Sequence, residues 1–241
     1  MSELRIALVA EGPTDFYLIQ AVLKAVLPNS FVMQQLQPEA TQPKLGTGWG
    51  GVLKWCYQAH QRHSGLLIDD PTLVGFDLII IHLDVDVAHQ QYSNCGEAVE
   101  TWAKENSWKN LPCKQPCPPV SDTVDNLVKV IESWLGQVKL GNCTLLCLPA
   151  QSSGSWLAAA VLPLTHPLLN NAECNTTLES QLEKLKKNQR IKKSRREYRN
   201  HAPSITENWN QVKQVCTQAA DFEELVLAAV SQKCSSGMAE D

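Results

Sequence analysis

The sequence predicts an α/β protein with a parallel, Rossmann-like sheet of about four strands, helices on both faces and a helical C-terminal portion. Short continuous apolar runs are typical of strands that are covered on both faces. These runs alternate along the chain with segments of helical periodicity, which is how parallel strands joined by helical crossovers appear in a sequence. The 241 residues, 44% of them hydrophobic, are enough to bury a core.

The first half of the chain contains three of the predicted strands. Residues 4–10, LRIALVA, form the first strand, and a segment with helical spacing follows it. Residues 30–36 are a weaker strand candidate, and a loop rich in proline and glycine separates them from a helix over 51–63. Residues 76–87, FDLIIIHLDVDV, include the strongest strand in the sequence.

The middle of the chain continues the alternation after an interruption. Residues 88–120 form a predicted insertion with one short helix at 96–106 and a loop rich in proline and cysteine. Apolar residues then recur at helical spacing over 121–138. The next strand is CTLLCL, residues 143–148, and SGSWLAAAVL, residues 153–162, is the next helix.

The last third of the sequence is predicted to be helical, over 176–199 and again over 207–231. We therefore divide the chain into an α/β core, residues 1–165, and a helical C-terminal extension, residues 166–241, that packs on this core.

A net charge of -4 hides one strongly basic segment, residues 184–199. This segment carries nine Lys or Arg and one Glu, whereas the rest of the chain carries 12 basic and 24 acidic residues. As one helix it would be about 24 Å long, and part of it would be simply solvated. We expect several of its cations to contact the phosphates of a nucleic acid, which gives affinity without sequence information. The candidates are Lys186, Lys187, Arg190, Lys192, Lys193, Arg195, Arg196 and Arg199.

The nine cysteines are interpreted as reduced thiols of a cytoplasmic protein. The N-terminus opens directly into a strand-like run without the features of a signal peptide, and no apolar run is long enough for a membrane span. Cys113 and Cys117 in a proline-rich loop have a spacing that could supply half a zinc site, but no second half is visible. Two loop thiols are the simpler interpretation.

Acidic residues follow two of the predicted strands. Glu11 comes after the first strand, and Asp84 and Asp86 come at the end of the strongest one, two residues apart and so on the same side of it. The carboxyl ends of parallel strands meet at one edge of a sheet. We therefore expect these carboxylates to hold one Mg²⁺ (or Mn²⁺), with Glu11 as a further ligand or as a proton carrier of raised pKa. The alternative is that they only cap the loops that follow.

Neighbouring residues suggest supporting roles. Gly12 removes side-chain bulk where a phosphate would approach, and Asp15, one helical turn beyond Glu11, either orients the site or is a favourable first-turn acid. His82 is interpreted as a structural histidine with a site role as the alternative. Residues 44–51, KLGTGWGG, form either a phosphate-binding nest of backbone amides or a flexible linker.

These residues carry a resemblance to a known family. A strand ending in Glu-Gly before a helix, followed later by a strand ending in Asp-x-Asp, resembles the TOPRIM domain of topoisomerases, primases, recombination proteins and OLD-type nucleases. VAEGPTD is most similar to the OLD-like branch, as are the glycines around 46–51 and the SSGSWLAAAV segment. The resemblance implies that Glu11 corresponds to the catalytic glutamate of the family, and Asp84 and Asp86 to its metal ligands.

The expected function is that of a magnesium-dependent nuclease acting on DNA or RNA, in genome maintenance or in defence against foreign DNA such as that of phages. The sequence departs from the resemblance at PAQSSGSW, residues 149–156, which has no acid where relatives often have one. It also lacks the phosphate loop of an ATPase. Two alternatives therefore stay open: a non-catalytic partner of a separate ATPase protein, and an enzyme acting on small phosphate esters.

Overall fold

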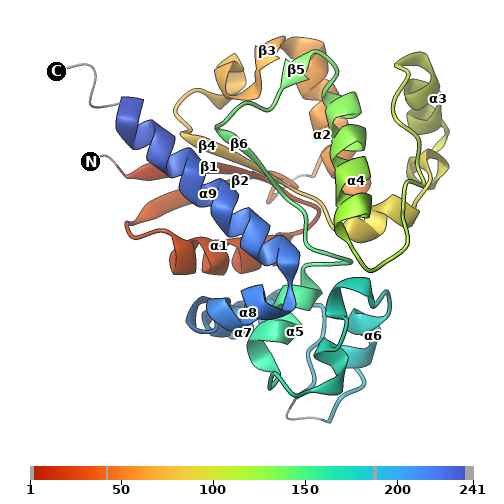
Figure 1. Ribbon diagram of the computed structural model, residues 1–241. Helices are drawn as coiled ribbons and strands as arrows, with labels where there is room; N and C mark the ends of the chain where they lie inside the picture. The colour runs from red at the N-terminus through yellow and green to blue at the C-terminus, as the bar shows by residue number, and fades with distance from the viewer. Residues whose placement is uncertain (1–2, 42, 187–188, 237–241) are drawn as a thin grey trace.

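The computed structural model describes residues 3–41, 43–186 and 189–236. It confirms the predicted fold class: a parallel four-stranded sheet of order β2-β1-β4-β6 is flanked by helices (Figure 1). The strands are β1 (Leu4–Val9), β2 (Phe31–Gln37), β4 (Leu78–His82) and β6 (Thr144–Cys147). A separate two-stranded sheet pairs β3 (Gly65–Leu66) with β5 (Val138–Lys139).

The continuous apolar runs of the sequence follow from burial on both faces of the sheet. In β1, Ile6 and Leu8 pack into one hydrophobic cluster, whereas Ala7 and Val9 pack into the cluster on the opposite face. Successive side chains of a strand point to opposite faces, so a doubly covered strand has no position for a solvated residue.

Helices cover both faces, as the alternating pattern predicts. Helices α1 (Pro13–Val26) and α9 (Thr217–Ser236) lie on one face, and α2 (Trp49–Arg62) and α4 (Ser121–Leu135) on the other (Figure 1). The predicted insertion contains α3 (Glu97–Glu105). Short 3-10 helices connect these elements: η1 (Leu67–Asp69), η2 (Pro71–Leu73), η3 (Val85–His89), η4 (Tyr92–Cys95), η5 (Pro167–Leu169) and η6 (Ala172–Cys174). Within the described ranges, none of the helices has both the length and the apolar character that a membrane span requires.

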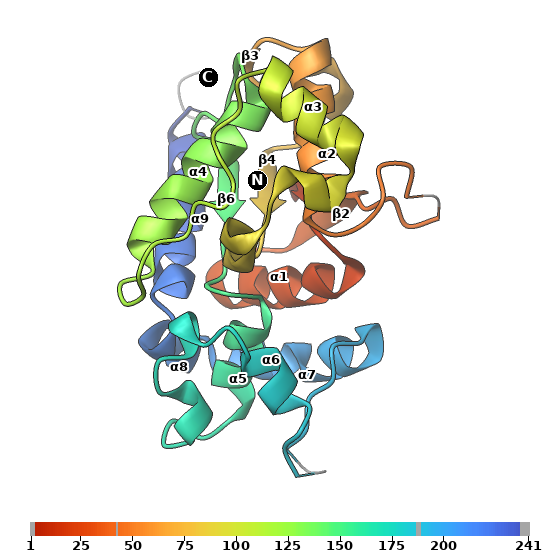
Figure 2. The ribbon, with the colours of Figure 1, turned by 90° about the vertical axis from the view of Figure 1, so that its right-hand side faces the viewer.

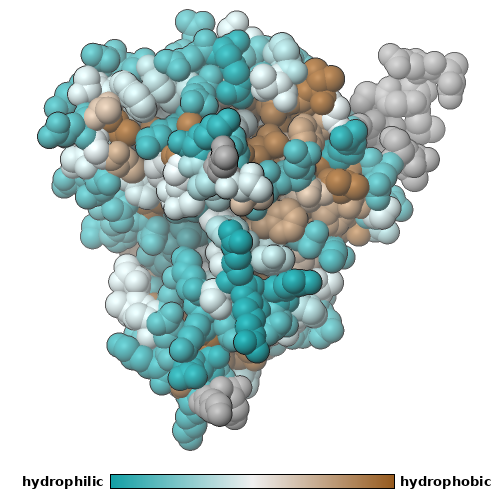
Figure 3. All heavy atoms as spheres, turned by 180° about the vertical axis from the view of Figure 1, so that it is seen from behind, coloured by the Kyte–Doolittle hydropathy of each residue, from teal (hydrophilic) through white to brown (hydrophobic). Residues whose placement is uncertain are grey.

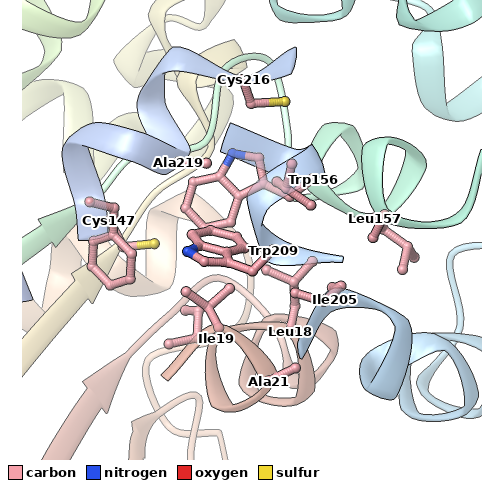
Figure 4. Close-up of a cluster of buried hydrophobic side chains, with 14 of the residues drawn as sticks. Leu18, Ile19, Ala21, Cys147, Trp156, Leu157, Ile205, Trp209, Cys216 and Ala219 are labelled. Atoms are coloured by element: carbon pink, nitrogen blue, oxygen red, sulfur yellow. The ribbon is translucent and has the colours of Figure 1, made fainter. Parts of the chain in front are cut away.

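The C-terminal helices share one core with the sheet. Figures 1 and 2 both show α5 to α8 gathered at one end of the molecule. In the cluster of Figure 4, Trp156 lies 5.5 Å from Trp209 and 6.0 Å from Phe222, measured between ring centroids, and Leu18 and Ile19 of α1 line the same cluster. The helices are α5 (Gly154–Val161), α6 (Leu178–Leu182), α7 (Arg195–Glu207) and α8 (Trp209–Val215).

The long C-terminal helices expected from the sequence are interrupted, so that prediction is wrong. The segment 176–199 is divided into α6, an irregular stretch and the start of α7, and 207–231 is divided at Cys216, which has an extended backbone. The break lies where Ile191 is buried and Lys193 reaches Asp84 and Glu179. The chain then starts a new helix at Ser194, whose side chain accepts a hydrogen bond from the Glu197 N–H.

A disulfide joins Cys117 to Cys174, with a Cα–Cα separation of 5.6 Å. The expectation that all cysteines are reduced is therefore wrong for this pair, and Cys117 cannot be half of a zinc site with Cys113. The spacing of the sequence could not show this, because the two residues are 57 positions apart. Closing a loop of this length stabilises a fold by about 4 kcal/mol in the chain-entropy treatment.

Candidate functional site

Carboxylates from the ends of two neighbouring strands meet at one edge of the sheet. Glu11 follows β1, and its Oε1 accepts a hydrogen bond from the backbone N–H of Asp84, which follows β4, at 2.8 Å. The strands β1 and β4 are directly paired in parallel, so their carboxyl ends lie side by side. The structure thus brings together two acids that are 73 positions apart in the chain.

Asp84 is held in place by a main-chain donor and faces two basic side chains. Its Oδ1 accepts a hydrogen bond from the Ser153 N–H at 2.8 Å, at the start of α5, and lies 3.4 Å from Nε2 of His82. Its Oδ2 lies 3.9 Å from Nζ of Lys193. A helix N-terminus favours an anion, so this position stabilises the carboxylate.

Asp15 ties the Glu11 turn to α5 from a buried position. It is only 3% exposed; its Oδ2 accepts from the Gly12 N–H and its Oδ1 from the Ser153 hydroxyl, both at 2.9 Å. Burial raises the pKa of Asp15, and His82 acts in the opposite direction. Asp15 is therefore more than a first-turn acid, whereas the approach of a phosphate at Gly12 stays a prediction.

His82 is fully buried between the two aspartates. Its Nδ1 lies 3.9 Å from Asp15 Oδ2, and neither ring nitrogen has a hydrogen bond of normal geometry to any described residue. Burial alone would lower the pKa of His82, but Asp15, Asp84 and Glu11 raise it to about 9. A protonated His82 places positive charge beside the carboxylates of Asp15 and Asp84. The sequence favoured a structural histidine and left a role in the site as the alternative.

Asp86 does not continue the strand, so the expectation that it projects beside Asp84 from a strand is wrong. The strand ends at His82, and Asp86 lies in the 3-10 helix η3, exposed, with its backbone N–H donating to the Gln151 carbonyl at 3.0 Å. Partial loss of hydration and the charge of Asp84 raise the pKa of Asp86 to about 7. Burial, followed by the charge of Asp84, also raises the pKa of Glu11 well above its ordinary value.

The structure adds one acid that the sequence analysis missed. Glu179 of α6 lies 3.1 Å from the Lys193 ammonium and accepts a hydrogen bond from the Tyr198 hydroxyl at 3.4 Å. A Cβ on Gly154 would approach the Oε1 of Glu179 to 2.7 Å, so a larger residue there would require the Glu179 side chain to shift. Glu179 is distant from PAQSSGSW in the chain, and no local pattern reveals that it lies beside Lys193.

The basic residues of the segment 184–199 do not lie along a single helix. Lys193 reaches Asp84, while the remaining predicted contacts are exposed around the irregular segment and α7: Lys186, Arg190, Lys192, Arg195, Arg196 and Arg199. Lys187 lies outside the described residues. The 44–51 loop adjoins the site, because the Gly48 N–H donates to the Glu11 carbonyl at 2.8 Å, and Trp49 of this loop stacks on Trp134.

No protein-family model, curated protein or solved structure matches this chain.

The carboxylate oxygens at this edge suit a hard cation such as Mg²⁺ or Mn²⁺. Among the described residues, no group of three or more His, Cys, Asp or Glu side chains is arranged to hold a metal ion. Magnesium, however, commonly takes only one or two protein carboxylates together with water and substrate. Asp84 and Asp86 stay the predicted members of that smaller set; burial, followed by the charge of Asp84, raises the pKa of both Asp86 and Glu11.

Replacing Asp86 by asparagine is expected to raise the melting temperature at pH 8 in the presence of a chelator. The folded state raises the pKa of this carboxyl from 3.8 to about 7, so ionisation destabilises the fold progressively as pH rises between these values. The asparagine side chain of the variant carries no such charge, and the difference should vanish below about pH 4, where the aspartate is protonated in both states. Thermal unfolding, monitored by circular dichroism, measures the melting temperatures at both pH values. A variant that melts at a lower temperature than the wild type at pH 8 would contradict the raised pKa of Asp86.

Proposed function

We propose that this protein is a TOPRIM-like, Mg²⁺- or Mn²⁺-dependent phosphodiesterase that cleaves DNA or RNA. One observation supports this most directly: the Glu11 carboxylate is hydrogen-bonded to the Asp84 backbone at the joint ends of β1 and β4. The arrangement combines an acid from the first strand with an Asp-x-Asp segment from its neighbour, as the resemblance in the sequence implies.

Each side chain has a defined task in this proposal. Asp84 and Asp86 hold the cation, which when bound polarises the scissile phosphate. Glu11, whose pKa is raised by burial and by Asp84, is the group that would transfer a proton to the leaving oxygen. Lys193 lies over Asp84 and supplies a positive charge for a substrate phosphate.

The surface around the site suits a polyanionic substrate. The C-terminal part that carries the basic residues is predominantly hydrophilic on the rear face of the molecule (Figure 3). The α7 arginines Arg195, Arg196 and Arg199, which follow Lys193 in the chain, are exposed. We infer a role in genome maintenance or anti-phage defence in the cytoplasm, with nucleic acid as the partner.

Cleavage of supercoiled plasmid and of end-labelled single strands tests the proposal. The protein is incubated with Mg²⁺ or Mn²⁺, and a matched reaction contains excess chelator. Nicked or shortened products that depend on the metal support a nuclease. The protein could instead hydrolyse a generic phosphate ester and cleave neither the plasmid nor the single strands. That result would assign the activity to small phosphate esters and overturn the nucleic-acid substrate.

Neutralising two exposed cations should weaken binding to nucleic acid in a salt-dependent way. The double variant Arg195→Gln with Arg196→Gln should lower the slope of log K against log[salt] for a short duplex by about 2 if both side chains contact phosphates. Lys129→Gln, on α4 over the other face of the sheet, is the matched control. Fluorescence anisotropy over a salt series gives the slopes, and unchanged slopes in the double variant would exclude these contacts.

A second function is favoured by one feature of the site. The Lys193 ammonium lies beside Asp84 and Glu179, where it already neutralises part of the acidic charge. A non-catalytic TOPRIM-like partner of a separate ATPase would retain such a closed site. Co-purification with an ATPase, together with no cleavage in any metal, would favour this role over the nuclease.

A further inference from the structure

The Cys117–Cys174 disulfide joins two segments that both lie near the 3-10 helix of Asp86. Cys117 belongs to the loop that leads into α4, and Cys174 ends η6 in the C-terminal part. In Figure 1 the loop before α4 descends toward the segment that precedes α6. The bond therefore connects the insertion to the C-terminal part of the chain.

Hydrogen bonds connect the 3-10 helix of Asp86 to the loop before Cys117 and, through Gln151, to Glu173 beside Cys174. On one side, the backbone N–H groups of Cys113 and Lys114 donate to the Ala88 carbonyl in η3, at 2.9 and 3.2 Å. Asp86 lies in the same 3-10 helix, so the Cys117 loop supports the segment that carries this carboxylate.

On the other side, the connection runs through Gln151. Its side-chain Nε2 donates to the Glu173 carbonyl at 3.2 Å, next to Cys174, and its own carbonyl accepts the Asp86 N–H at 3.0 Å. Gln151 has φ +59°, a left-handed conformation that costs a non-glycine residue free energy and must be imposed by its surroundings. The disulfide thus closes a ring of contacts around η3.

A reductant can reach the bond. Both cysteines are half-buried and line a cavity of about 400 Å³ together with His89 and Lys114. A disulfide within a cavity open to solvent is accessible to an attacking thiolate, unlike one sealed in a core.

We propose that Cys117–Cys174 is a thiol–disulfide switch that sets the position of Asp86. A dithiol reductant attacks one sulfur, and the mixed disulfide is resolved by its second thiol. Two protein thiols and one reductant disulfide result, so two electrons and two protons pass to the protein. Reduction opens the ring, frees the loop that supports η3 and releases the constraint on Gln151. The regulation of cleavage by this switch rests on the proposed nuclease function. The effect of the switch on the position of Asp86 does not.

Three measurements on oxidised and dithiothreitol-treated protein test the switch. Differential alkylation with mass spectrometry should label Cys117 and Cys174 only after reduction. Hydrogen exchange should become faster in peptides covering 84–91 and 113–117 and stay unchanged in β2, which reports global unfolding. Mn²⁺ affinity, read by electron paramagnetic resonance, should fall about tenfold, the range seen when groups that orient a metal ligand are lost.

Matched variants distinguish the effect of the Cys117–Cys174 bond from the effects of the other cysteines. The double variant Cys117→Ser with Cys174→Ser should behave as reduced protein with or without reductant, whereas Cys143→Ser, which alters a half-buried free thiol, should keep the response. Should the double variant not fold, the reduced wild type carries the test. Labelling of both cysteines without reductant, or equal exchange in 84–91 in both states, overturns the switch. Altered exchange and Mn²⁺ affinity without any cleavage would support the switch and refute the nuclease.

Discussion

Asp84→Asn is expected to reduce metal-dependent cleavage at least about 100-fold, because it removes the carboxylate at the centre of the site. Asparagine is nearly isosteric, and its side-chain oxygen can still accept the hydrogen bond from the Ser153 N–H. The fold around the site should therefore survive while the charge is lost. Initial rates on labelled strands at saturating Mg²⁺, with circular dichroism to verify folding, measure the effect.

The control for this substitution is Asp125→Asn, which removes the same charge from an exposed position on α4. Its cleavage rate should match that of the wild type. If Asp84→Asn and the wild type cleave equally well, the assignment of the site is refuted, whatever the cause of the cleavage.

Trp156→Ala is expected to produce the largest loss of stability. Trp156 is fully buried in the cluster of Figure 4, between Trp209 and Phe222, and joins the C-terminal helices to the sheet. Truncating a buried aromatic residue costs about 3–5 kcal/mol through lost burial and a residual cavity. For a chain of this size the melting temperature should fall by about 10 °C.

Trp156→Phe is the informative comparison. It keeps most of the ring, and the indole N–H that it removes has no hydrogen-bond partner among the described residues, so its loss carries little penalty. Urea unfolding should place this variant close to the wild type and the alanine variant far below it. Equal unfolding midpoints for the wild type and Trp156→Ala would show that this cluster does not hold the two parts together.

Local patterns were sufficient for most of the sheet. The runs at 4–10 and 76–87 predict β1 and β4 because both faces of each strand are buried, which leaves no polar position to obscure the pattern. The break between α6 and α7 was not predictable, since it depends on Ile191 being buried and on Lys193 turning toward distant acids. Helical periodicity contains no information about such tertiary contacts.

The site was predictable only where it follows from strand order. Glu11 and Asp84 meet because neighbouring parallel strands end at the same edge, which the sequence pattern implies. Glu179 and Ser153 could not be found in this way: one acts from a remote helix, and the other contributes its backbone N–H, which any residue except proline would offer. The Cys117–Cys174 pairing was equally hidden, because thiol spacing does not encode three-dimensional proximity.

The position of α9 has a consequence for how the protein is made. This helix covers the same face of the sheet as α1, yet it is synthesised about two hundred residues later than β1. During translation, the part of that face that α9 covers, over β6, stays exposed until α9 has left the ribosome. This part of the core therefore cannot be completed before α9 is made, and until then the nascent chain offers a hydrophobic surface to chaperones.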